Sequence, residues 1–330
     1  MNTTILGTGS YLPKEVLTSE ELDVRLGVDA GWIFDKTLIR ERRVAAPHEA
    51  SSDLATEAAQ RALDAACVDA ADVDLIVLAT STPDQPLPAT ACLVQRNLGA
   101  TGAAAFDVGA VCTGFVYALS VADAMLAANP QYEAALVIGV DTYSRILDYT
   151  DRRTACLFGD GAGAVVLGRS AGTAGILGGV LGADGSLADL VQIPGGGSRK
   201  PASADTVEHG DHFFKMRGRE VRTVTGAAIS GLIDDVLKSA GVTMDDVDLV
   251  VPHQANGVMM REWSDKLGIG SDVMHMTVGT TGNTGAASVP ICLDDAARAD
   301  RLAAGDIVLL VAFGGGFTWG GHVLRWNGCV

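Results

Sequence analysis

The sequence predicts an α/β protein made of two similar halves, in which helices cover central β-sheets, and two observations support this prediction. First, residues 54–77 and 228–251 follow one plan: apolar residues at helical spacing, a turn, and an apolar strand-like run, DVDLIV in one copy and DVDLVV in the other. Second, strand-like runs alternate with amphipathic helix-like runs along the chain. We place the two halves at 1–170 and 171–330.

Further elements continue this plan in order. In the first half a strand-like run, AAAFDV (103–108), leads through a short turn into the helix-like run FVYALSVADAML (115–126). Each half then ends in a buried strand, a glycine-rich turn and another strand. These strand pairs cover 135–141 with 161–168, and 308–315 with 320–326. Two similar halves packed together place their equivalent loops near a common axis, where a site can form.

Composition indicates a folded protein of the cytoplasm. Of the 330 residues 48% are hydrophobic, which is enough for a large core, and no unbroken apolar run approaches the roughly 18 residues of a membrane span. The N-terminus has no signal-peptide pattern. With 24 basic and 40 acidic residues the net charge is −16, which disfavours nucleic acid and anionic membranes as partners. The six cysteines form no CxxC pair, so we expect a reducing compartment.

Cys112 lies between the strand-like run 103–108 and the helix-like run 115–126, flanked by small residues in DVGAVCTGF. An isolated cysteine is usually a small buried hydrophobe. A strand, a tight turn and a helix, however, form an elbow that aims a side chain into a cavity, and a helix N-terminus favours the thiolate. We therefore expect Cys112 to be a nucleophile and leave Cys67, Cys92, Cys156 and Cys292 in the core.

Two stretches of the second half offer polar partners for this thiol. His253 lies in VPHQAN, just after the repeated strand, and Asn283 lies in GNTGAAS. Alone, each reads as an ordinary loop residue, turn residue or helix cap. Together with Cys112 they indicate a nucleophile with two polarising groups.

Three other motifs are weaker. GTGSYL (7–12) lacks the third glycine of a dinucleotide-binding turn, and GDGAGA (159–164) lacks the Lys-Ser/Thr of a phosphate-binding loop. HGDH (209–212) has no nearby third ligand for a metal. We expect neither a metal nor a redox cofactor.

The motifs DVGAVCTGF, VPHQAN, GNTGAAS and AFGGGFTWG, taken together, resemble the β-ketoacyl-acyl-carrier-protein synthase III family of the thiolase superfamily, and the resemblance covers essentially the whole chain. It implies a duplicated αβαβα thiolase-like fold and a homodimer. It also implies decarboxylative Claisen condensation of an acyl-CoA primer with a malonyl thioester, malonyl-acyl carrier protein or malonyl-CoA. The pathway would be fatty-acid initiation or specialised polyketide or quinolone-type synthesis.

The resemblance also assigns roles to residues. Cys112 would take the acyl group, and the backbone N–H groups of Cys112 and Gly315 would form the oxyanion hole. His253 and Asn283 would stabilise the malonyl enolate. Further positions concern substrates and carrier: Trp32, Arg152 and Phe313 for substrate binding, Leu87 for closing the partner's acyl pocket, and Arg219 and Arg222 for carrier docking. The chain departs from the family pattern at Lys36 and Val258, where arginine is frequent.

Two alternatives stay open. An acyltransferase of the same fold would form an ester or amide without condensation, which would leave Asn283 without a role. A non-catalytic partner subunit would need no reactive thiol. A thiolase is a further possibility, but it would need a second catalytic cysteine in the region that here reads FGGGFTWGG, which contains no cysteine.

Overall fold

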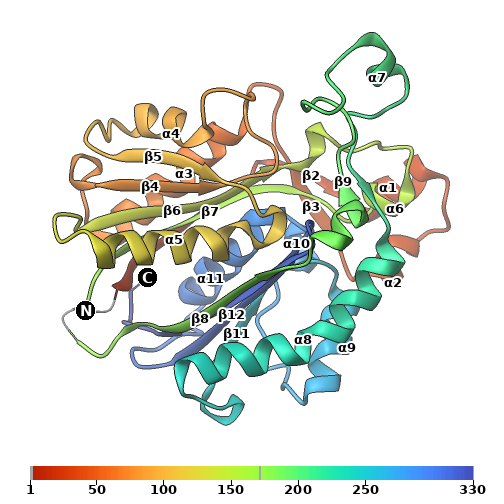
Figure 1. Ribbon diagram of the computed structural model, residues 1–330. Helices are drawn as coiled ribbons and strands as arrows, with labels where there is room; N and C mark the ends of the chain where they lie inside the picture. The colour runs from red at the N-terminus through yellow and green to blue at the C-terminus, as the bar shows by residue number, and fades with distance from the viewer. Residues whose placement is uncertain (1–2, 171, 330) are drawn as a thin grey trace.

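Helices and sheets alternate in five layers in the computed structural model, which describes residues 3–170 and 172–329 (Figure 1). Helices α3 (Ser51–Ala66) and α4 (Thr90–Leu98) cover the outer face of one sheet, and α8 (Gly218–Ala240) and α9 (Gly257–Leu267) cover the other. Between the sheets lie α5 (Gly114–Ala128) and α11 (Ser288–Arg298). The predicted duplicated αβαβα fold is confirmed. Residue 171, where we placed the start of the second half, lies outside the described residues.

The first sheet has the order β1-β7-β6-β4-β5. Strand β4 runs parallel to both β5 and β6, while β7 is antiparallel to β6 and to β1. Its strands are β1 (Thr3–Tyr11), β4 (Leu75–Ala79), β5 (Ala104–Val108), β6 (Ala134–Thr142) and β7 (Asp160–Arg169).

The second sheet repeats this arrangement with one strand fewer, in the order β11-β12-β13-β8. Its pairings correspond: β11 is parallel to β12, β12 antiparallel to β13, and β13 antiparallel to β8. The place of β5 is taken by a single bridge between Val250 and Met274. Its strands are β8 (Gly175–Ala183), β11 (Leu249–Pro252), β12 (Ile307–Gly314) and β13 (Thr318–Arg325).

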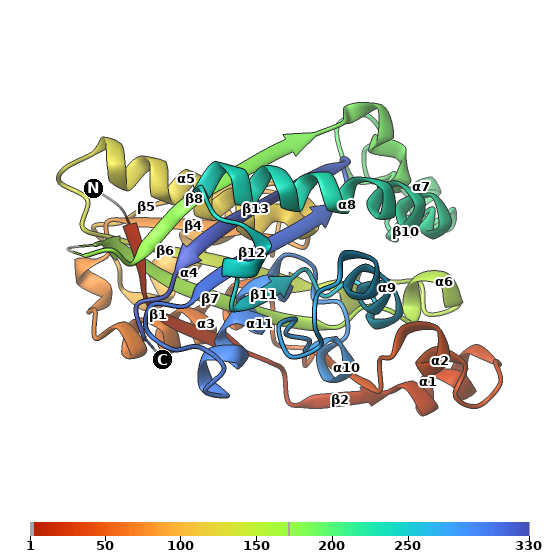
Figure 2. The ribbon, with the colours of Figure 1, turned by 90° about the horizontal axis from the view of Figure 1, so that it is seen from below.

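Shorter elements gather at one end of the layers, away from β1 (Figure 2). They are β2 (Glu15–Thr18), α1 (Ser19–Leu26), α2 (Trp32–Thr37), β3 (Glu41–Val44), α6 (Arg152–Ala155), β9 (Val191–Gln192), α7 (Ala204–Glu208), β10 (Lys215–Met216) and α10 (Val278–Thr281). The 3₁₀ turns of the chain are η1 (Ala70–Asp72), η2 (Val111–Thr113), η3 (Tyr143–Arg145), η4 (Gly185–Leu190), η5 (Met244–Asp246) and η6 (Gly285–Ala287).

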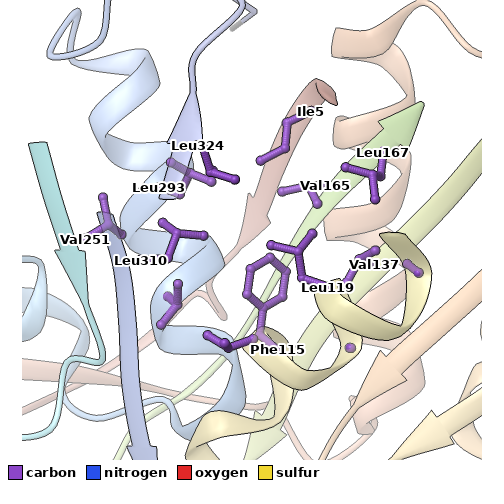
Figure 3. Close-up of a cluster of buried hydrophobic side chains, with 14 of the residues drawn as sticks. Ile5, Phe115, Leu119, Val137, Val165, Leu167, Val251, Leu293, Leu310 and Leu324 are labelled. Carbon is purple, nitrogen blue, oxygen red and sulfur yellow. The ribbon is translucent and has the colours of Figure 1, made fainter. Parts of the chain in front are cut away.

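The main core lies between the two sheets (Figure 3). Phe115 and Leu119 of α5 point into it, and side chains from both sheets, such as Val165 and Leu310, surround them. All four are at most 2% exposed. Burying such side chains contributes roughly 1.5–3 kcal/mol each, so this layer holds the two halves together.

The segment Val111–Ala128 has the length and composition of a membrane-crossing helix, with half of it buried in the molecule. It contains α5, which packs in the main core with Phe115 and Leu119. A helix that lies between two sheets contacts apolar side chains on most of its faces, and it is therefore apolar on most faces itself. The composition of this segment therefore follows from its place between the sheets.

The motif GTGSYL forms part of a strand. Gly7 and Gly9 lie in β1, where a Cβ would come within 2.4 Å of the backbone of α3. These glycines allow the helix to pack closely on the sheet, and they do not form a nucleotide-binding turn.

Candidate active site

A cavity of about 320 Å³ lies where the two halves meet. Cys112 comes from the first half, and His253 and Asn283 come from the second. The structure thus brings together the three residues that the sequence suggested for catalysis. Phe313 and Gly315, which the resemblance assigned to the same site, also line this cavity.

Cys112 sits in the 3₁₀ turn η2, between β5 and α5. The preceding residue, Val111, has φ 49°, an unfavourable conformation for a β-branched residue. Strain of this kind tends to occur where a side chain is held in a functional position. Here the turn leaves Cys112 only 9% exposed, on the wall of the cavity.

Our expectation that the helix N-terminus favours the Cys112 thiolate is wrong. Burial, with a contribution from the negative charge of Asp141, raises the pKa of Cys112 to about 12. The effect of a helix N-terminus is commonly about 1 kcal/mol, which is too small to offset burial of the whole thiol. At neutral pH the resting site therefore holds a thiol, and its proton must leave when it attacks a substrate.

His253 follows β11 directly, and its backbone N–H donates to the carbonyl of Val311, 2.8 Å away, in the neighbouring strand β12. The imidazole is 4% exposed, and burial lowers its pKa to about 4, so it is neutral at pH 7. Its Nδ1 lies 2.6 Å from the hydroxyl oxygen of Ser288. When Ser288 donates this hydrogen bond, the ring proton is on Nε2.

Asn283 is fixed by both its backbone and its side chain. Its N–H donates to the carbonyl of Leu157 (2.9 Å), and its carbonyl accepts from the N–H of Gly159 (3.0 Å). The side-chain oxygen accepts from the backbone N–H of Gly285 at 2.9 Å. The amide nitrogen is therefore the group that Asn283 offers to a ligand in the cavity.

The FGGGF turn of the second half packs directly on the turn that carries Cys112. A Cβ on Gly314 would lie 2.8 Å from both the carbonyl oxygen of Ala110 and the hydroxyl of Thr113. The hydroxyls of Thr113 and Thr318, 3.0 Å apart, join the two turns. Gly315 and Cys112 both line the cavity.

The mouth of the cavity carries the residues suggested for the CoA moiety. The guanidinium of Arg152 lies over the ring of Trp32, with its carbon 5.5 Å from the ring centroid. Arg219 and Lys36 also line the cavity. An aromatic plane among cations suits an adenine with its phosphates.

Arg222 also lines the cavity, but it forms an exposed ion pair with Glu262. Arg153 is likewise paired with Asp151, at 2.6 Å. These acidic partners offset part of the positive charge that an acidic carrier protein would meet.

Leu87 lies on the exposed loop between β4 and α4 and is 83% exposed. The resemblance places this residue in the partner's acyl pocket, and a role of that kind requires a second chain.

The sequence reasoning missed the aromatic residues beside the thiol. Tyr143 stacks on Phe158 with ring centroids 4.3 Å apart, and Phe214 packs edge-on against both rings. Phe158 and Phe214 line the cavity, and Tyr143 is fully buried. These residues are far apart in the sequence, and only Phe158, which directly precedes the GDGAGA motif (159–164), lay near a motif.

Neither Cys67 nor the HGDH motif lines the cavity. Cys67 was expected in the core, but it is exposed at the C-terminal end of α3. In the HGDH motif, His209 pairs with Asp205 and His212 packs on Phe213. Over residues 3–170 and 172–329, no cluster of three or more potential ligands is placed to hold a metal ion.

Family models match two parts of the chain. The model described as 3-oxoacyl-[acyl-carrier-protein] synthase III matches residues 106–185, and the model for the C-terminal part of that family matches residues 237–326.

Full-length relatives agree with these matches. The acetoacetyl CoA synthase NphT7 of Streptomyces sp. strain CL190 is 49% identical over 324 residues, which are 98% of each chain. The β-ketoacyl-[acyl-carrier-protein] synthase III of Caldanaerobacter subterraneus subsp. tengcongensis is 46% identical over 98% of this chain and 97% of its own.

Solved structures are similar over the same length. The 3-oxoacyl-[acyl-carrier-protein] synthase III of Aquifex aeolicus superimposes with a TM-score of 0.90 at 40% identity, covering 98% of this chain and all of its own. The priming β-ketosynthase of the R1128 polyketide pathway gives a TM-score of 0.91 at 32% identity, covering 99% and 96% of the two chains.

Proposed function

The chain belongs to the β-ketoacyl-[acyl-carrier-protein] synthase III family of condensing enzymes, and from this premise we propose that it joins an acyl group from acyl-CoA to a malonyl thioester with loss of CO2. The observation that carries the proposal is the shared cavity. One half supplies a thiol for acyl transfer, and the other supplies two neutral polar groups beside it.

In the first half-reaction the sulfur of Cys112 attacks the thioester carbonyl of acyl-CoA. The backbone N–H groups of Cys112 and Gly315 stabilise the oxyanion. The C–S bond to CoA then breaks. CoA leaves as a thiol, whose sulfur carries the proton that Cys112 has lost. The result is an acyl-Cys112 thioester.

In the second half-reaction a malonyl thioester binds in the same cavity and loses CO2. The electron pair of the broken C–C bond forms an enolate, whose oxygen accepts hydrogen bonds from His253 Nε2 and the Asn283 amide. The enolate carbon attacks the acyl carbonyl, and the sulfur of Cys112 leaves as a thiolate, which takes up a proton from water to restore the thiol. Both donors are neutral, so neither adds negative charge beside the enolate. The reaction needs no cofactor beyond its two thioester substrates.

The experiment that tests this proposal follows both half-reactions. Purified protein is incubated with a series of acyl-CoAs, and the mass of the Cys112 peptide is measured. Radiolabelled malonyl-CoA or malonyl-acyl carrier protein is then added, and CO2 release is compared with product formation. The proposal expects acyl-Cys112 and one CO2 per product. An ester or amide product without CO2 would instead support the acyltransferase, and an unlabelled Cys112 would support the non-catalytic subunit.

For the extender, the ion pairs at the mouth favour CoA over an acidic carrier protein. Arg222 is already paired with Glu262, and the chain carries a net charge of −16. Protein docking of acidic partners relies on unpaired local positive charge. We expect a lower KM for malonyl-CoA than for malonyl-carrier protein. Reversing Arg219 and Arg222 to Glu tests the docking patch: a KM for malonyl-carrier protein that stays at the wild-type value would remove these residues from it.

A homodimer in a reducing cytoplasm is part of this proposal. Leu87 is exposed in the single chain, and β5 lies at the edge of its sheet, so both are available to a second copy. Cys112 must also remain reduced to act. Light scattering in solution tests the dimer, and a monomer would exclude it.

A further inference from the structure

Asp141 is a fully buried carboxylate at the end of β6 for which the two half-reactions have no use. Burial raises its pKa to about 7, whereas hydrogen bonds from two backbone N–H groups and two hydroxyls favour the charged form. A buried acid is costly unless such donors surround it. The position of these donors therefore indicates what the carboxylate holds in place.

One carboxylate oxygen contacts the other half of the molecule. Asp141 Oδ2 accepts a hydrogen bond from the backbone N–H of Ala286, 2.8 Å away in the turn η6. The neighbouring residue, Gly285, has φ 58°, and a Cβ there would lie 2.1 Å from the same oxygen and 2.4 Å from the ring of Tyr143. The turn thus rests directly on the carboxylate, and this contact requires glycine.

The same turn orients the amide of Asn283. The N–H of Gly285 donates to Asn283 Oδ1 at 2.9 Å, which leaves the amide nitrogen for the cavity. If the turn moved, the oxygen would lose its donor and the amide could rotate. The orientation of Asn283 therefore depends on the turn, and the turn rests on Asp141.

The second carboxylate oxygen holds the loop that follows β4. Asp141 Oδ1 accepts from the backbone N–H of Ser81 at 2.6 Å and from the hydroxyl of Thr82 at 3.1 Å. An asparagine at position 141 has only one oxygen. The N–H groups of Ser81 and Ala286 bind different oxygens of the carboxylate, and the asparagine replaces one of these oxygens by an NH2 donor, so one N–H is left without an acceptor.

We propose that Asp141 is a positioning residue, which fixes the amide of Asn283 through the turn η6 so that it donates to the malonyl carbonyl. This role rests on the proposed function, because it concerns the decarboxylation step. Asp141 acts through Asn283 and does not touch the substrate itself.

Asp141→Asn tests this role in the full-length enzyme. We expect acyl-Cys112 to form, while CO2 release from malonyl-CoA falls by about tenfold or more, since a donor to the enolate is misplaced. A double-mutant cycle adds the decisive readout. In an Asn283→Ala background, Asp141→Asn should cause no further loss of CO2 release, because the group through which it acts is gone.

Asp160→Asn is the matched control. Asp160 is also fully buried in the first sheet and accepts from two backbone N–H groups, those of Ala45 at 2.8 Å and Ser144 at 2.9 Å. Both donors belong to the first half. Loss of this carboxylate should lower the melting temperature to a similar extent but leave the ratio of CO2 release to acylation near the wild-type value.

The outcomes separate the two proposals. Equal effects of Asp141→Asn and Asp160→Asn on the ratio of CO2 release to acylation would overturn the positioning role. It would also be overturned if Asp141→Asn lowered CO2 release equally in the wild-type and the Asn283→Ala backgrounds. A wild-type enzyme that forms no acyl-Cys112 or releases no CO2 would overturn the proposed function and this role with it. If Asp141→Asn does not fold, Asp141→Ser, which retains one hydroxyl acceptor, is assayed in the same way.

Discussion

The ends of strands β6 and β12 occupy corresponding places in the two halves, and each contacts the catalytic turn of the other half. Leu75 pairs with Ala135 in the first sheet, as Leu249 pairs with Val308 in the second. Asp141 lies six residues after Ala135, and Gly314 lies six residues after Val308, so the two residues occupy corresponding positions. Asp141 binds the turn before α11, whereas Gly314 packs against the turn before α5.

This difference shows how one architecture serves two chemical tasks. The turn of Cys112 is held by close backbone packing on Gly314, and Cys112 lines the cavity. The turn next to Asn283 is held by a carboxylate that accepts an N–H, which leaves the amide free to donate. In the proposed reaction the first half would supply the nucleophile, and the second would supply the hydrogen-bond donors.

The largest effect expected from this comparison is the separation of the half-reactions. Cys112→Ala should abolish acylation and lower turnover by more than about 10³-fold, since the covalent route is lost. Cys67→Ala, at an exposed cysteine outside the cavity, is the control and should be fully active. Mass spectrometry after exposure to acyl-CoA measures the acylation.

Changes in the second half should spare acylation. His253→Ala and Asn283→Ala should each lower CO2 release by about 10²–10³-fold while acyl-Cys112 still forms, because each removes a donor to the enolate. Asn283→Asp should be at least as damaging, since it adds a negative charge. An equal loss of acylation in the Cys112, His253 and Asn283 variants would contradict the division of labour.

The protonation of Cys112 gives a test by pH. With a pKa of about 12, the thiolate fraction should rise about tenfold for each pH unit between pH 7 and 10, without a plateau. Iodoacetamide labelling of the empty enzyme, followed by mass spectrometry of the Cys112 peptide, measures this rate. A plateau below pH 8 would show that the turn stabilises the thiolate after all.

A smaller effect concerns the tautomer of His253. Ser288→Ala removes the hydroxyl at 2.6 Å from Nδ1, so the Nε2 proton is no longer enforced. Loss of about 1 kcal/mol from one hydrogen bond predicts a fall of about fivefold in CO2 release, with acylation unchanged. Ser288→Thr, which keeps the hydroxyl, should retain most of the wild-type CO2 release. Equal activity of the Ala and Thr variants would remove Ser288 from this role.

The smallest effect concerns primer length and the dimer. Leu87→Ala should shift the preferred acyl-CoA toward longer chains, because burial of each additional methylene stabilises the bound acyl group by about 0.8 kcal/mol. The kcat/KM values for acyl-CoAs of increasing length measure the shift. If the profile does not change, the floor of the acyl pocket lies elsewhere, and the buried aromatic residues Tyr143, Phe158 and Phe214 would be the next to vary.

The sequence by itself predicted the duplicated fold, because the repeat of DVDLIV as DVDLVV and the alternation of helix and strand are local patterns. It also predicted that Cys112, His253 and Asn283 form one site. Cys112 and His253 each lie at a turn after a strand, whereas Asn283 lies at a turn after the short helix α10. The match to the motifs of a known family added their expected roles.

Only the tertiary structure decided the protonation of Cys112, the ion pair of Arg222 with Glu262, and the contact between Asp141 and the turn η6. Asp141 and Ala286 are distant in the sequence, and no local pattern connects them. The pKa of a buried group depends on how much water all its neighbours exclude, whichever part of the chain they come from. Local sequence patterns therefore identified which side chains the site contains, and long-range packing determined how those side chains are charged and held.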